Sequence, residues 1–118
     1  MNRMKLLFAM LVLIGFVACG DDEDLVTMTC ETDGLTYNSV VADILNTSCA
    51  TSSCHASNTN TTFPMGDYTE AFAAVGEGRI IGAINHESGF SQMPKGGTKL
   101  DDCTIDKLTS WINDGAPE

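Results

Sequence analysis

The chain has 118 residues, of which 16 are acidic and six are basic, and its formal net charge at pH 7 is −10. This length is enough for one domain and not for two. The acidic balance speaks against nucleic acids and anionic membrane surfaces as partners, because both repel negative charge. It favours neutral or basic partners.

The first 18 residues have the pattern of a secretory signal rather than of a folded domain. Two basic residues precede an almost unbroken apolar run from Leu6 to Val17, and a small residue stands before Cys19. A membrane-spanning helix needs roughly 20 apolar residues, so this run is too short for a stable transmembrane anchor. The pattern resembles the lipobox of bacterial lipoproteins, although Phe16 stands where leucine is usual. The resemblance implies a signal peptide over 1–18, lipidation of Cys19 and a protein held at the outer membrane of the cell envelope. An ordinary secretory signal is the alternative.

Residues 19–36 are expected to form an acidic flexible tether. Four acids, residues 21–24, follow Cys19-Gly20 directly. This run is either a surface-export signal like those of some Gram-negative lineages or a solvated linker extended by charge repulsion. Cleavage before Cys19 removes two bases and no acid, so the mature chain carries four bases and 16 acids, a formal charge of −12.

The folded domain is predicted over 37–118. A domain of about 80 residues is marginally stable unless a disulfide, a metal or a cofactor supports its core. Its first helix is predicted over Tyr37–Leu45, with Asn38 or Ser39 as the N-terminal cap. Aliphatic residues recur here at helical spacing, namely Val40, Val41, Ile44 and Leu45.

The first helix leads into the run Cys49-x4-Cys54-His55. This run is a longer-loop variant of the Cys-x-x-Cys-His motif that attaches haem. In that motif both thiols add to the vinyl groups of the porphyrin, and the adjacent histidine ligates the iron. Two alternatives stay open on the motif alone. One is a local Cys49–Cys54 disulfide, and the other is a zinc site formed by Cys49, Cys54, His55 and a further ligand.

Three more helices are predicted after this run, and no segment alternates with the period of a strand. Asp67 and Glu70 have the spacing of a capping box and open a helix over Tyr68–Val75, with Phe72 facing inward. A third short helix is predicted over Arg79–Asn85. The last helix is predicted over Asp101–Asn113, capped by Gly115, and its buried stripe comprises Ile105, Leu108, Trp111 and Ile112. The predicted class is therefore all-α.

The order of these pieces resembles a family of small c-type cytochrome domains in bacterial exported lipoproteins. The resemblance covers residues 38–116 and implies a cytochrome c-like fold of short helices wrapped around one covalent haem. It also implies an electron-transfer protein, not an enzyme, with a redox protein as partner. The matching pieces are Ile44-Leu45, Cys49, Cys54-His55, Gly78-Arg79-Ile80, Met93-Pro94-Lys95-Gly96-Gly97, Leu100 and Trp111-Ile112-Asn113-Asp114-Gly115-Ala116.

The resemblance implies a role for each candidate site residue. Cys49 and Cys54 would form the thioethers to the haem, and His55 would be the proximal iron ligand. The expected sixth ligand is Met93, because its thioether favours ferrous iron and Pro94 restricts the backbone beside it. The rival ligands are His86, which would give a bis-histidine haem of lower potential, and Met65.

Cys30 and Cys103 remain after these assignments. In cytochrome folds the first and last helices pack together, so a Cys30–Cys103 disulfide is predicted; two separate thiols or an intermolecular bond are the alternatives. Two other functional classes stay open. One is a haem-free binding or structural module held by disulfides, and the other is a five-coordinate haem sensor or peroxidase.

Overall fold

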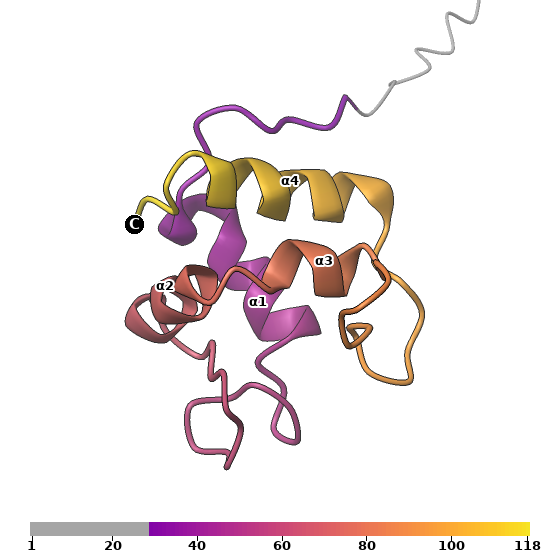
Figure 1. Ribbon diagram of the computed structural model, residues 1–118. Helices are drawn as coiled ribbons and strands as arrows, with labels where there is room; N and C mark the ends of the chain where they lie inside the picture. Colours follow the sequence, from indigo (N-terminus) through magenta and orange to yellow (C-terminus); the bar gives the residue numbers. More distant parts are fainter. Residues whose placement is uncertain (1–28) are drawn as a thin grey trace, which may run out of the picture.

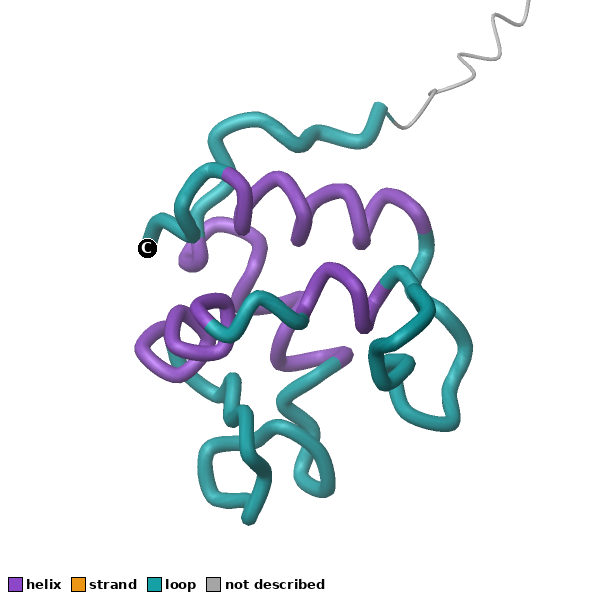
Figure 2. Tube along the Cα trace, viewed as in Figure 1, coloured by secondary structure: helices purple, strands orange, loops and turns teal. Residues whose placement is uncertain are grey.

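The computed structural model describes residues 29–118, and these form helices joined by loops (Figures 1 and 2). No strand occurs among them, so the all-α class is confirmed. No helix in this range is both long and apolar enough to cross a membrane. The predicted signal peptide 1–18, the lipidated Cys19 and the acidic run 21–24 lie outside the described residues. The elements are the π-helical turn η1 (Tyr37–Val41), α1 (Ala42–Ser48), α2 (Tyr68–Gly76), α3 (Ile80–Ile84) and α4 (Asp102–Asn113).

The first helix is a continuous unit made of η1 and α1, and its cap differs from the prediction. Thr36, not Asn38 or Ser39, is the N-cap residue. Its hydroxyl accepts a hydrogen bond from the Ser39 backbone N–H at 3.2 Å, and the Ser39 hydroxyl accepts one from the Thr36 N–H at 3.0 Å. Ser39 therefore contributes as the reciprocal partner of a capping box. The predicted apolar face is present, because Val41 and Leu45 are buried.

Helix α2 begins at the predicted cap, but one predicted core residue lies outside. Asp67 accepts the Glu70 N–H at 2.9 Å, as its spacing indicates. The buried face of α2 carries Ala71 and Ala74, whereas Phe72 is 50% exposed. The prediction that Phe72 faces inward is wrong, because Phe72 lies on the neighbouring face of the helix, where its ring contacts Tyr68 with centroids 5.8 Å apart.

Helices α3 and α4 match the predicted segments closely. Asp101 caps α4, accepting hydrogen bonds from the Thr104 hydroxyl at 2.6 Å and the Thr104 N–H at 3.0 Å. These bonds lower the pKa of the Asp101 carboxyl below its ordinary value, the side-chain bond having the larger effect. Gly115 follows α4 with φ of 92°, the left-handed backbone expected of a C-terminal glycine.

The core is closely packed where the two ends of the domain meet. Trp111 is 1% exposed, and its indole N–H donates to the Pro117 carbonyl at 2.9 Å. Tyr37 packs against both Trp111 and Tyr68, with ring centroids 6.4 and 5.4 Å apart. The Tyr68 hydroxyl donates to the Ala116 carbonyl at 3.1 Å. These bonds, with the Tyr37 backbone N–H that donates to the Pro117 carbonyl at 2.9 Å, fix the C-terminal tail against α4, α2 and η1.

The segment before η1 is attached to the domain, although residues 19–36 were all predicted as tether. Cys30 and Cys103 form the predicted disulfide, with Cα atoms 5.5 Å apart. The Ser110 hydroxyl donates to the Thr32 carbonyl at 2.8 Å, and Leu35 is buried in the core. In Figure 1 this indigo segment runs beside α4. The folded unit therefore begins near Cys30, and the boundary at residue 37 was placed too late.

Removal of the Cys30–Cys103 disulfide is expected to lower the free energy of unfolding by about 4 kcal/mol, since the bond joins residues 73 positions apart and restricts the unfolded chain. The measurement is urea unfolding of wild type and of a double variant, Cys30→Ser with Cys103→Ser. The control compares both proteins in the presence of a reductant, where they should be equally stable. Equal stability of variant and oxidised wild type would contradict this expectation.

Candidate functional site: an apolar cavity beside the core

A cavity of about 930 Å³ borders the buried core. Its walls come from α1, the loop after α1, the α2–α3 region, the loop after α3 and α4. Five buried core residues line it, namely Leu45, Met65, Ala74, Ile84 and Leu108. The space opens to solvent on one side, and its volume lies within the range of small-molecule and cofactor sites.

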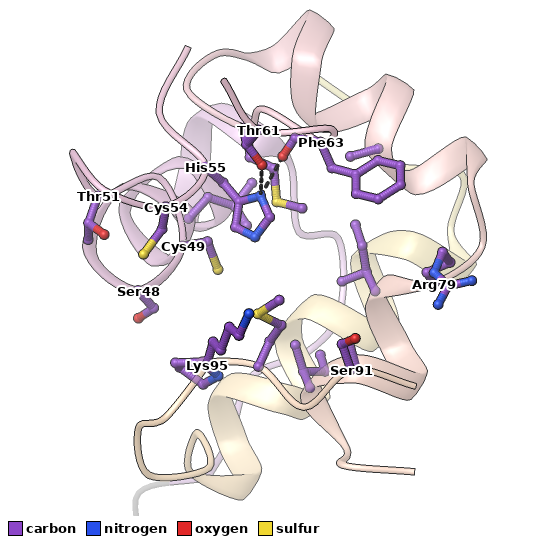
Figure 3. A pocket seen from close by; sticks show the side chains of 18 of the residues that line it. Ser48, Cys49, Thr51, Cys54, His55, Thr61, Phe63, Arg79, Ser91 and Lys95 are labelled. Carbon is purple, nitrogen blue, oxygen red and sulfur yellow. Dashed lines mark hydrogen bonds between the residues drawn. The ribbon is translucent and has the colours of Figure 1, made fainter. Parts of the chain in front are cut away.

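The loop after α1 brings Cys49, Cys54 and His55 to one wall of the cavity (Figure 3). The backbone N–H of His55 donates to the Cys49 carbonyl at 3.0 Å, and the backbone N–H of Cys54 donates to the Thr51 carbonyl at 2.9 Å. These bonds close the four-residue spacer into a compact turn. Despite the longer spacer, Cys49, Cys54 and His55 all line the cavity.

The two thiols of this loop are free and differ in exposure. Cys49 is half-buried, and Cys54 is exposed. Burial, with a smaller contribution from the neighbouring Cys54, raises the pKa of the Cys49 thiol to about 11. Cys49 is therefore a neutral thiol at physiological pH. The local Cys49–Cys54 disulfide considered above is not formed in the structure.

Within residues 29–118, no three His, Cys, Asp or Glu side chains are grouped so as to hold a metal ion. A zinc site needs four such ligands, or three and a water. Cys49, Cys54 and His55 are not arranged in this way. The observation bears on zinc alone, because a haem iron takes only one or two ligands from the protein.

The ring of His55 is held in one tautomer. Its Nδ1 lies 2.6 Å from the Phe63 carbonyl oxygen, with the Thr61 hydroxyl at 3.4 Å. A carbonyl can only accept a hydrogen bond, so Nδ1 carries a proton, and in the neutral imidazole the lone pair lies on Nε2. Figure 3 shows the second ring nitrogen facing the open space. An imidazole fixed by a backbone carbonyl through Nδ1 is the usual arrangement of a metal-ligating histidine.

The three candidates for a sixth ligand occupy different places. Met93 lines the cavity from the loop after α3. Met65 also lines it, and its N–H donates to the carbonyl of His55 at 2.7 Å, which ties it to the His55 wall. His86 is not among the lining residues, and its Nε2 lies 3.0 Å from the Met93 carbonyl oxygen.

Two basic side chains, Arg79 and Lys95, reach the cavity. The described range holds four basic and 12 acidic residues, yet only one acid, Glu77, lines the cavity. The cavity is thus locally basic in an acidic domain. In Figure 3, Lys95 and Ser91 lie across the open space from His55.

Arg79 is held at this place by an aromatic contact. Its guanidinium lies 5.7 Å from the centroid of the Phe90 ring, within the range of a cation–π interaction. The Phe90 ring in turn packs directly on Gly82, where an added Cβ would come within 2.6 Å of the ring. Glycine at position 82 therefore permits the close approach that places Phe90, and with it Arg79.

No family model, curated protein or solved structure matches this chain.

The sequence did not reveal several of these site features. The Phe63 carbonyl that fixes His55 is a backbone atom and carries no sequence signal. Arg79 belongs to the Gly78-Arg79-Ile80 piece, which indicates no role for its side chain. The bond from His86 to Met93 depends on a backbone conformation that the sequence does not specify.

Proposed function

We propose that this chain is a single-haem c-type cytochrome domain that transfers electrons in the cell envelope. The observation that carries the proposal is the pairing of Cys49 and Cys54 with His55 on one wall of an apolar cavity. His55 donates through Nδ1 to a backbone carbonyl, which leaves Nε2 free to bind a metal. A disulfide or a loop histidine with no ligand would not require this arrangement.

The chemistry of the cavity lining fits a haem. The apolar lining suits the porphyrin faces, and two cations, Arg79 and Lys95, match the two carboxylates that a haem carries. Cys49 and Cys54 would hold the group covalently, and His55 would ligate its iron. A bound haem supplies reversible one-electron chemistry at the iron. The protein residues contribute orientation, exclusion of water and the choice of axial ligands.

Met93 is the sixth ligand in this proposal. The second protein ligand would come from a segment other than the one that holds His55. Met65 is bonded through its N–H to His55 itself, whereas Met93 belongs to the loop after α3. His86 does not line the cavity, and its Nε2 is hydrogen-bonded to a carbonyl. If His55 and Met93 both held the iron, it would have no open position for a substrate, so we propose electron transfer rather than catalysis.

The Cys30–Cys103 disulfide supports an oxidising compartment, in agreement with export. We accordingly propose that residues 1–18 are a signal peptide and that lipidated Cys19 attaches the protein to the outer membrane. The excess of acids over bases in the described range favours a redox partner with a basic or neutral docking face.

The absorption spectrum of the exported protein tests this proposal. We expect sharp bands in the reduced protein, and we expect the haem to stay with the polypeptide through acid–acetone extraction. Colour lost on extraction, or no haem at all, would overturn the proposal and leave the disulfide-held module. A five-coordinate ferric spectrum would instead favour a haem sensor or peroxidase.

A further inference from the structure

The loop between α3 and Met93 returns to the helix that it leaves. The backbone N–H of Met93 donates to the Ala83 carbonyl at 3.1 Å, and the backbone N–H of His86 donates to the same oxygen at 3.3 Å. The Glu87 N–H donates to the Gly82 carbonyl at 2.9 Å. The last turn of α3 is therefore the base on which Met93 is held.

His86 completes this attachment through its side chain. Its Nε2 lies 3.0 Å from the Met93 carbonyl oxygen, and because that oxygen can only accept, Nε2 carries the proton. Both backbone polar groups of Met93 are thus bonded, the N–H to Ala83 and the carbonyl to His86. No other side chain among residues 29–118 makes a hydrogen bond to the Met93 backbone.

The backbone of His86 is in the left-handed region, with φ of 59°. Residues other than glycine rarely adopt this conformation, and those that do are concentrated at functional sites. Here the conformation turns the chain out of α3 and directs the imidazole back across the loop to Met93. Glycine would allow the same turn without strain, but it would not supply the donor.

We infer that His86 is a positioning residue, which fixes the Met93 backbone so that its thioether meets a group bound in the cavity. The inference rests on the proposed function, in which that group is a haem and Met93 its sixth ligand. It assigns His86 a role different from the rival one of iron ligand. The side chain acts through Met93 and does not touch the haem.

The test compares three variants of the full-length holoprotein, His86→Ala, His86→Gln and His86→Gly. Alanine removes the donor and keeps a side chain at the left-handed position. Glutamine has an amide N–H at a reach similar to Nε2 and should restore the bond. Glycine removes the donor and also relieves the strained backbone. Comparison of the Ala and Gln variants therefore isolates the effect of the hydrogen bond. The Gly variant shows whether backbone strain at position 86 contributes to the effect of losing that bond.

The readout is the affinity of the ferrous protein for carbon monoxide, which binds only when Met93 has left the iron. The apparent affinity is proportional to the fraction of protein in that open state. Loss of one hydrogen bond should raise this fraction, and hence the affinity, about twofold to tenfold in the Ala and Gly variants. The Gln variant should stay close to wild type. A residue that merely stabilised the fold would change the unfolding midpoint without changing carbon monoxide affinity.

The inference is overturned if Met93→Ala raises carbon monoxide affinity while all three His86 variants match wild type. It is also overturned if Gln behaves as Ala does, because the donor would then not matter. The proposed function fails in a different way, through the absence of covalent haem from the wild-type protein.

Discussion

Replacement of Cys54 by alanine is expected to leave at most one thioether and to reduce the yield of holoprotein severely. Cys54 stands beside His55, so in the proposed cytochrome its thioether would fix the haem next to the imidazole of His55. Without Cys54, only Cys49 would remain to attach the haem covalently. Cys49 is half-buried, and its raised pKa of about 11 keeps it protonated, which makes it the less reactive thiol.

The measurement is the covalent haem content of exported protein, by mass spectrometry and by the position of the reduced α-band in pyridine, which depends on how many vinyl groups remain. Ser52→Ala is the matched control, because Ser52 lies in the same exposed loop but does not line the cavity. It should have normal haem content. Cys49→Ala should retain one thioether. Normal haem content in the Cys54 variant would remove the attachment site from the proposal.

The helices were predictable because their signals are local. Asp67 caps α2 as its side chain and spacing indicate, and Trp111 and Leu108 are buried as the period of α4 requires. Phe72 was misplaced for a physical reason. A short helix rich in alanine buries a narrow stripe, and the stripe of α2 passes through Ala71 and Ala74, one position away.

The contacts between segments distant in the sequence were harder to predict. The attachment of residues 30–35 to α4 depends on a disulfide and on the bond from Ser110 to Thr32. Composition favoured a tether there, because acidic and small residues dominate before Leu35. The candidate ligands could be named from the sequence, yet only the three-dimensional arrangement places Met93 in the cavity lining and leaves His86 out of it.

Replacement of Met93 by alanine is expected to alter the coordination of the iron more than any other single substitution outside Cys49, Cys54 and His55. The ferric wild-type protein should show the weak near-infrared band of sulfur-to-iron charge transfer, and the variant should lack it. Its iron should bind small ligands without competition, so its carbon monoxide affinity should exceed that of the His86 variants. Met65→Ala is the matched control, because it removes another thioether from the same cavity. It should keep the band.

Met93→His should restore six-coordination and lower the reduction potential, since imidazole does not favour ferrous iron as a thioether does. The drop should be a substantial part of the roughly 0.8 V range over which axial ligands set haem potentials.

The opposite result in the alanine variants would contradict Met93 as the ligand. If Met93→Ala is silent and His86→Ala creates an open coordination site, the haem is bis-histidine. In that case the loop after α3 must rearrange on haem binding, because His86 now donates to the Met93 carbonyl and does not line the cavity. The domain would then work at low potential, with a reducing respiratory chain as its source of electrons.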